Sequence, residues 1–169
     1  SNQFAWNVEG AANIAAAIES SAVWYDGNPH VAVGTWSGGT GVATLYRDGT
    51  QTATARNATV GTVTNTRSLL ISSGDAASFA ALTPVYGWAI YQRALTSTET
   101  LAASRYLLGY PGYRMPAGAT LFIDLRDDRC WNGTGRTVAD LSGNGLTGTL
   151  VSSPPTRGIP MVLSTLDRF

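Results

Sequence analysis

The sequence predicts an all-β fold, a β-sandwich of two antiparallel sheets with one short helix. Short runs of alternating apolar and polar residues recur along the chain, separated by turn residues, as in sheets that bury one face. One stretch in the second half instead has helical spacing. The chain has 169 residues, of which 44% are hydrophobic. That length is enough to bury a substantial core, so we expect one domain, residues 1–169.

The first part of the chain changes its pattern along its length. Residues 10–19, GAANIAAAIE, are rich in alanine, and their spacing fits either a short run of helical turns or an irregular edge segment. Residues 30–36, HVAVGTW, alternate and are expected to form a strand. In residues 41–55 two alternating runs meet at Asp48 and Gly49, a pair typical of a tight hairpin turn.

The middle of the chain contains further strands and then the predicted helix. Residues 68–74 and 85–95 continue the β pattern. Thr96 and Glu99 then have the spacing of a capping box, in which each residue hydrogen-bonds the backbone of the other. Because apolar residues recur at roughly helical spacing after Thr96, we expect a helix near 97–108.

The C-terminal part is expected to return to β structure. A turn-rich connector, residues 109–118, follows the predicted helix. Beyond it, strands are expected at 119–126, 146–151 and 158–166, and residues 127–145 are expected to be loop with one short strand. The apolar runs of this part therefore add strands to the sandwich.

Three segments, in their order and spacing, resemble a known family. The matching residues are His30, Val31, Ala32 and Val33 in a first strand, Leu45, Tyr46, Asp48 and Gly49 in a hairpin, and Gly87, Ile90, Tyr91, Arg93, Ala94, Leu95 and Glu99 in a closing segment. In these residues the chain resembles the second half of a laminin G-like domain of the concanavalin A-like lectin/glucanase superfamily. The resemblance implies a concanavalin A-like jelly-roll β-sandwich.

The C-terminal part shows a second resemblance to the same family. The run DLSGNGLTGTL, residues 140–150, is similar to the family's first strands, so the halves of the domain stand in permuted order. The chain can be a circular permutation that closes as one sandwich, since termini of compact domains often lie close together. Alternatively, residues 119–169 supply their strands to a neighbouring unit, or the chain is a piece cut across two tandem domains.

The superfamily includes glucanases, but the residues of this chain do not favour catalysis. Retaining glycosidases use two carboxylates about 5 Å apart, which the glucanase branch places in a Glu-x-Asp-x-(x)-Glu strand motif. The three glutamates, Glu9, Glu19 and Glu99, lie in no such pattern. A nucleophile and base pair is equally unpromising, because His30 is the only histidine and a structural role suits it better. We expect that the protein is not an enzyme.

The resemblance implies calcium as the metal to consider, because many laminin G-like domains bind it through Asp and Asn oxygens. Calcium takes six to eight oxygen ligands. Asp140 and Asn144 are the candidate ligands, with Asp124 or Asp26 as further oxygen donors in a folded sandwich. The alternative, which we favour, is that Asp140 and Asn144 are turn formers that bond their own backbone and that no cofactor is required.

Sugar binding is the other candidate chemistry, because exposed aromatic rings stack on sugar rings while amides and acids bind hydroxyl groups. Two loop-like stretches carry such residues. The candidates are Trp24, Tyr25 and Asp26 in the first stretch and Trp131 and Asn132 in the second. The alternative is that both tryptophans close the open ends of the sandwich core.

Charge and hydropathy exclude some classes of partner. The formal net charge is zero and only 13% of residues are charged, so the chain offers no basic face to nucleic acid. The longest apolar run, residues 11–18, is far shorter than a membrane span. Zero net charge also weakens self-repulsion, which eases packing against other protein subunits, copies of the same chain among them.

Two functions therefore fit the sequence. The first is a non-catalytic, surface-exposed module for adhesion and assembly, and the resemblance implies a structural or capsid decoration component of a phage-like particle. The second is a lectin-like, carbohydrate-binding recognition domain of a secreted or cell-surface protein, with a glycan as its partner. Both functions place the protein on a virion or at the extracellular surface.

Overall fold

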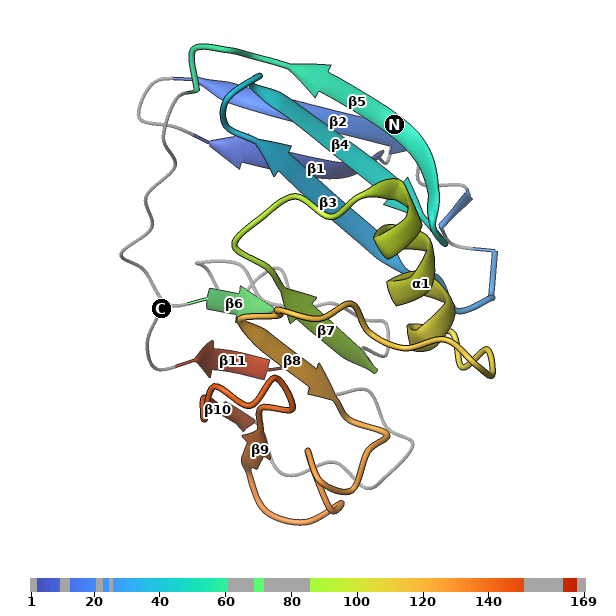
Figure 1. The fold of residues 1–169 in the computed structure, drawn as a ribbon, viewed down its shortest axis with the longest axis vertical. Coiled ribbons are helices and arrows are strands. Elements are labelled where there is room, and N and C mark those ends of the chain that lie inside the picture. The colour runs from blue at the N-terminus through green and yellow to red at the C-terminus, as the bar shows by residue number, and fades with distance from the viewer. Residues whose placement is uncertain are drawn as a thin grey trace. The chain divides into compact units, whose positions relative to one another are not determined.

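The fold is given by a computed structural model, which describes residues 3–9, 13–20, 23–24, 26–60, 69–71, 86–150 and 163–166. The described part consists mainly of strands in antiparallel sheets, with one α-helix, so the all-β prediction is confirmed (Figure 1). The chain divides into two compact units, which we call unit 1 (Ser1–Asn65 and Arg93–Ala117) and unit 2 (Thr66–Gln92 and Gly118–Phe169). The expectation of a single domain stays a prediction.

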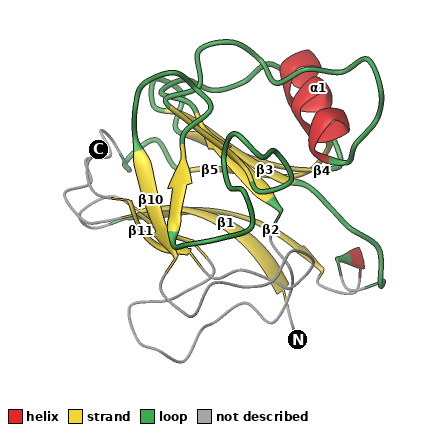
Figure 2. Cartoon of the chain, turned by 90° about the horizontal axis from the view of Figure 1, so that it is seen from below, coloured by secondary structure: helices red, strands yellow, loops and turns green. Residues whose placement is uncertain are grey.

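Unit 1 contains two groups of strands and the helix. Its elements are β1 (Gln3–Glu9), β2 (Ile14–Ser20), β3 (Ala32–Ser37), β4 (Val42–Arg47), β5 (Thr50–Arg56) and α1 (Ser97–Leu107). The strands β1 and β2 form an antiparallel pair, and β3, β4 and β5 form an antiparallel sheet in that order. Figure 2 shows the β1–β2 pair on one side of this sheet and α1 on the other.

Of the alanine-rich segment 10–19 the structure describes residues 13–19, and β2 covers all of these but the first, so the helical alternative is wrong for this part. The sequence did not predict β1. β2 pairs with it in antiparallel register, and Ile18 lies opposite Ala5. Ala15 and Ala17 are buried, whereas Ile14 and Ile18 are exposed. This alternation has a period of two residues, because successive side chains of a strand point to opposite faces. Pairing and burial therefore override the helical propensity of alanine.

The core of unit 1 lies between the β1–β2 pair and the β3–β4–β5 sheet. Trp6 of β1 lies against the backbone of β3, and its indole N–H donates to the carbonyl oxygen of Thr35 at 3.2 Å. A Cβ atom at Gly34 would lie 2.2 Å from Cδ2 of Trp6, so the indole occupies space that only a glycine leaves free. Around this contact a small apolar cluster forms from Val8, Ala15, Ala43, Val60 and Trp36.

The hairpin predicted at Asp48 and Gly49 is confirmed. These residues connect β4 to β5, and both have positive φ, 53° for Asp48 and 87° for Gly49. Positive φ at both central residues defines a type I′ turn, whose twist matches that of the paired strands. Gly49 also allows α1 to approach, since a Cβ atom there would lie 2.7 Å from Cδ1 of Leu101.

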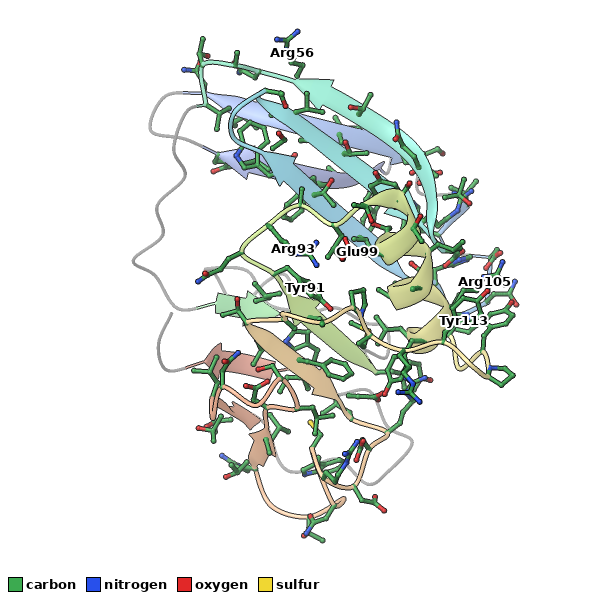
Figure 3. The ribbon with its side chains drawn as sticks, in the orientation of Figure 1. Arg56, Tyr91, Arg93, Glu99, Arg105 and Tyr113 are labelled. Atoms are coloured by element: carbon green, nitrogen blue, oxygen red, sulfur yellow. The ribbon has the colours of Figure 1, made fainter. Side chains whose placement is uncertain are left out.

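The predicted helix is confirmed as α1, and its capping box is formed. The Thr96 hydroxyl accepts from the backbone N–H of Glu99, whose carboxylate accepts in turn from the backbone N–H of Thr96. Arg93 donates to both carboxylate oxygens of Glu99, at 2.8 and 2.6 Å (Figure 3). Small side chains on the buried face of α1 let it lie close to the sheet; they are Thr100, Ala103 and Ser104.

Unit 2 is built from short strands. Its elements are β6 (Leu69–Ile71), β7 (Gly87–Ile90), β8 (Leu121–Asp124), β9 (Thr137–Ala139), β10 (Thr147–Leu150) and β11 (Leu163–Leu166). One antiparallel sheet has the order β6–β11–β10–β9, and β7 pairs with β8. Two strands from the C-terminal segment, β8 and β11, thus pair with β7 and β6 of the same chain.

The core of unit 2 is centred on β8. Leu121 and Ile123 point inward and are fully buried, and Trp88 and Ile90 of the paired β7 pack against them. The other buried members are Leu125, Cys130, Trp131 and Val138. The strands predicted at 85–95 and 119–126 are both shorter than expected.

Within the described residues of both units, no helix has the length and apolar character needed to cross a membrane.

Candidate functional site

The candidate sugar-binding residues of unit 2 are held by local contacts. Trp131 is only 4% exposed, and its indole N–H donates to the carbonyl oxygen of Gly135 at 3.3 Å. Its ring lies in the core, which favours the alternative that this tryptophan closes the core, because a buried ring presents no face to a sugar. Asn132 is exposed, but its Oδ1 accepts from the backbone N–H and the hydroxyl of Thr134 at 3.0 and 2.8 Å, as in a turn.

The candidate calcium ligands also hold a turn. Asp140 Oδ1 accepts from the backbone N–H groups of Phe122 and Ser142 at 2.9 and 2.8 Å, and Oδ2 accepts from the Ser142 hydroxyl at 2.6 Å. Burial would raise the pKa of Asp140, but the hydrogen bonds from Ser142 and Phe122 outweigh it and lower the pKa. The Asn144 amide nitrogen donates to the carbonyl oxygen of Thr120 at 2.9 Å. These contacts favour turn formation over metal ligation.

The further aspartates considered for calcium have other partners. Asp124 is buried and accepts from the Arg126 guanidinium at 2.9 and 2.8 Å. Asp26 belongs to unit 1 and accepts from the backbone N–H of Asn28 at 2.8 Å. Among the residues that the structure describes, no group of three His, Cys, Asp or Glu side chains is arranged to hold a metal ion. That no cofactor is required stays a prediction, with calcium as the candidate metal.

Trp24 lies in the loop that follows β2, whereas Tyr25 lies outside the described residues. The Trp24 ring stacks on Phe4, with 4.2 Å between ring centroids, and its indole N–H donates to Glu19 at 2.9 Å. Arg47 forms an ion pair with Glu19 and places its guanidinium 5.8 Å from the Trp24 ring centroid. The ring is half-buried by these contacts, and Phe4 occupies one face, so this tryptophan also has a structural role.

His30 connects the same loop to the β4–β5 turn. Its Nδ1 lies 2.7 Å from Asp48 Oδ2, and its Nε2 lies 3.0 Å from Asp26 Oδ1. Asp48 Oδ1 also accepts from the backbone N–H of Val31 at 2.8 Å. The hydrogen bond to Asp48 raises the pKa of His30 above 6.5, which favours the imidazolium that donates from both nitrogens. Since both nitrogens have carboxylate partners, neither is presented to a substrate.

Asp26 is the more exposed partner of His30. Hydrogen bonds lower the pKa of Asp26 to about 2. They come from the backbone N–H of Asn28, from the Asn28 side chain and from His30. Asp26 is therefore anionic when His30 is charged. The three side chains form a bridge that fixes the 26–30 loop on the hairpin turn, and this explains structurally why the only histidine stands where it does.

An open recess of about 370 Å³ lies beside this bridge and shares Asp48 with it. The other lining residues come from the loop before β3 and from the C-terminal end of α1; they are Pro29, Arg105, Leu108 and Tyr110. The Arg105 guanidinium carbon lies 4.5 Å from the Tyr110 ring centroid, a cation–π arrangement. Figure 3 shows Arg105 near Tyr113 at this end of α1, where Tyr110 and Tyr113 are 47% and 43% exposed.

Among the residues that line this recess, the sequence indicated only Asp48, through the hairpin turn. Asp48 was recognised as a turn former, and Arg105 as part of a helix. A usable signal was present in the connector GYPGY, where Tyr110 and Tyr113 alternate with turn residues. Aromatic residues in a turn-rich segment are often exposed, and exposed aromatics mark binding surfaces.

Comparison with known proteins adds no relative: no family model, curated protein or solved structure matches the chain. The features that bear on function are therefore the His30 bridge and the recess beside it, both in unit 1, and the exposed surface of the sheets.

Proposed function

We propose that the protein is a non-catalytic β-sandwich module for adhesion and assembly, with a second copy of the chain as its partner. The supporting observation is the outward face of the β1–β2 pair. Ile14 and Ile18 are 54% and 45% exposed on this face. Ala16 lies between them on β2, and Ala5 lies opposite Ile18 on β1. We call these four residues the β1–β2 outer face.

The β1–β2 outer face has the chemistry of a contact surface. The four side chains are apolar, and Asn7 and Glu9 of β1 lie opposite Ala16 and Ile14 on the same face. Burying apolar surface contributes about 25 cal/mol per Å². The strand pair also has edges that carry unpaired backbone groups within the described residues, and such edges readily pair with another strand. Zero net charge removes the self-repulsion that would oppose contact between copies.

The acidic and basic residues support a non-catalytic role. Glu19 is held by Arg47 and Trp24, and Glu99 caps α1 and pairs with Arg93. Both nitrogens of His30 face carboxylates. A general acid or base must reach the proton that it transfers, so groups already engaged in structural contacts are poor candidates.

The pairing of the C-terminal strands supports a permuted laminin G-like jelly roll. A circular permutation requires that the last strands pair with earlier strands of the same chain. The pairing of β8 with β7 and of β11 with β6 meets that requirement. The neutral, apolar-faced module that results suits a subunit displayed on a virion or at an extracellular surface, as in a capsid decoration protein.

The proposal is tested by measuring self-association. Sedimentation velocity over a range of concentrations should show a reversible dimer or larger assembly for the native chain. In the proposed contact the Ile18 side chain buries apolar area against the second copy. Threonine is smaller and more polar, so Ile18→Thr should weaken association about tenfold or more. Val23→Thr is the matched control, since Val23 is also an exposed β-branched residue but lies in the loop after β2. A native chain that stays monomeric at all concentrations would contradict the proposal.

A further inference from the structure

The loop that follows the buried Trp131 contains an Asn-Gly pair whose amide is held on one side only. Asn132 is exposed, and its Oδ1 accepts from the backbone N–H of Thr134 at 3.0 Å and from the Thr134 hydroxyl at 2.8 Å. Within the described residues no acceptor holds the Asn132 amide nitrogen. The amide is therefore fixed through its oxygen and open at its nitrogen.

This turn places the side-chain carbonyl of Asn132 beside the next peptide nitrogen. The hydrogen bond from the Thr134 N–H to Oδ1 closes a ring that contains Cγ of Asn132 and the backbone nitrogen of Gly133, as in an Asx turn. Gly133 has a φ of 86°, and a Cβ atom there would meet nothing within 4 Å. Because glycine has no side chain, nothing on residue 133 shields its nitrogen from Cγ.

The Gly133 nitrogen can attack that carbonyl carbon. A bond forms between Gly133 N and Asn132 Cγ, and the proton of this nitrogen passes to solvent water. The bond from Cγ to Nδ2 breaks, Nδ2 takes up a proton from solvent and leaves as ammonia, and a succinimide ring remains. Water then opens the ring at either carbonyl and gives aspartate or isoaspartate. The net reaction converts an amide and water into a carboxylic acid and ammonia.

Thr134 is positioned to assist this attack. Negative charge develops on Oδ1 of Asn132 as the new bond forms, and both Thr134 donors already point at this oxygen. Donors that are in place before the reaction stabilise such an oxyanion without further reorganisation. The contacts that hold the turn therefore also favour the reaction.

The second Asn-Gly pair of the chain lacks these properties. Asn144 is also exposed, and Gly145 after it also has positive φ. Its amide nitrogen, however, donates to two backbone carbonyl oxygens at 3.1 and 2.9 Å and to the Ser142 hydroxyl at 2.9 Å. These hydrogen bonds must break before the nitrogen of Asn144 can leave as ammonia, so we expect Asn144 to react slowly.

Asn57 provides a second comparison. Its Oδ1 accepts from the backbone N–H and the hydroxyl of Thr59, as in the turn at Asn132. Ala58 follows it in place of a glycine, and its amide nitrogen donates to the carbonyl oxygen of Ile14 at 3.0 Å. Among these three asparagines, Asn132 alone combines a following glycine, donors on its oxygen and an unheld nitrogen.

From these observations we infer that Asn132 is a site of spontaneous deamidation, promoted by the turn that Thr134 holds. The product adds a negative charge to a chain whose formal net charge is zero. Isoaspartate also inserts the Cβ carbon of residue 132 into the main chain directly after Trp131, whose indole spans the same loop to the Gly135 carbonyl. The modification therefore loosens the loop that closes the core of unit 2.

Peptide mapping by mass spectrometry tests the inference. Trypsin cleaves after Arg129 and Arg136, so Asn132 and Asn144 fall in separate peptides, 130–136 and 137–157, of the same sample. In the native chain at neutral pH, Asn132 should deamidate at least about tenfold faster than Asn144, because the hydrogen bonds of Asn144 protect its nitrogen. In urea the two rates should converge, since both turns are then lost.

A variant separates the role of Thr134 from that of the sequence. Thr134→Val removes the hydroxyl donor and keeps the backbone N–H, and it should slow deamidation of Asn132 about tenfold. Thr137→Val is the matched control, because Thr137 is an exposed threonine of β9 without a contact to Asn132 Oδ1. The deamidated form, separated by ion exchange, should expose the Cys130 thiol to a thiol reagent faster than the unmodified form.

The inference is overturned if Asn144 deamidates as fast as Asn132 in the native chain, or if their rate ratio is the same in urea. An unchanged rate in Thr134→Val, with a native circular dichroism spectrum, would refute the assistance by Thr134. Equal thiol reactivity of the two forms would refute the effect on the core. Ile18→Thr should leave the rate at Asn132 unchanged, so this test is independent of the assembly proposal.

Discussion

The contact between Gly34 and Trp6 gives the sharpest test of how the β1–β2 pair packs on the β3–β4–β5 sheet. In Gly34→Ala the new methyl carbon would lie 2.2 Å from Cδ2 and 2.6 Å from Cε2 of the Trp6 indole. Atoms cannot approach so closely, and the ring cannot yield without giving up its hydrogen bond to the Thr35 carbonyl and its place in the core. The substitution must therefore separate the two layers locally.

The expected size of the effect follows from two opposing terms. Inserting a methylene-sized group into a packed core costs about 1–3 kcal/mol. Replacing a strand glycine by alanine returns about 0.5–1 kcal/mol, because glycine loses more backbone entropy on folding. Because a 2.2 Å approach is a severe overlap, the upper end of the packing cost applies, and we expect Gly34→Ala to lower the free energy of unfolding by about 2–2.5 kcal/mol. In a Trp6→Val background, where the ring is absent, the same substitution should stabilise by about 0.5 kcal/mol.

Urea denaturation followed by far-ultraviolet circular dichroism measures both values. Gly39→Ala is the control, because a Cβ atom there meets nothing within 4 Å and the residue does not have positive φ. A double-mutant cycle between positions 6 and 34 isolates their coupling. If Gly34→Ala were as stable as the native chain, or if its effect were the same in both backgrounds, the packing of Trp6 on β3 would be refuted.

Two further predictions concern titratable groups. Because the hydrogen bond to Asp48 raises the pKa of His30 above 6.5, its stabilising contribution is complete below pH 6.5 and is lost as the pH rises through the raised value. The urea midpoint of the native chain should fall over that interval, and His30→Gln should make the fall smaller. In an NMR titration the ring C–H resonances of His30 should report a pKa above 6.5, and a pKa below 6.5 would contradict the bridge. Because burial raises the pKa of Cys130 to about 11, a thiol reagent at pH 8 should modify it far more slowly in the native chain than in urea. Equal rates would show that the core of unit 2 is open.

The elements predicted correctly from sequence are those whose signal is local. The hairpin depends on Asp48 and Gly49, which adopt positive φ side by side, and the start of α1 depends on Thr96 and Glu99, which cap each other. Both features need only a few neighbouring residues. Their sequence signals can therefore be recognised without knowledge of any distant contact.

The elements missed are those that depend on distant contacts. The alanines of β2 suit a helix as well as a strand, and only pairing with β1 and packing on the sheet decide between them. The depth of Trp131 likewise depends on the strands around it. The recess could not be predicted because Pro29, Asp48 and Arg105 are far apart in the sequence and meet only in the folded unit.

The most direct test of the permuted sandwich is whether β8 pairs with β7 of its own chain. The two strands are antiparallel, with Ala89 opposite Phe122. In an equal mixture of isotope-labelled and unlabelled protein, an isotope-filtered nuclear Overhauser experiment separates contacts within one chain from contacts between chains. We expect the Ala89–Phe122 contact only within labelled molecules. Its appearance between labelled and unlabelled molecules would mean that the C-terminal strands are donated to a neighbour.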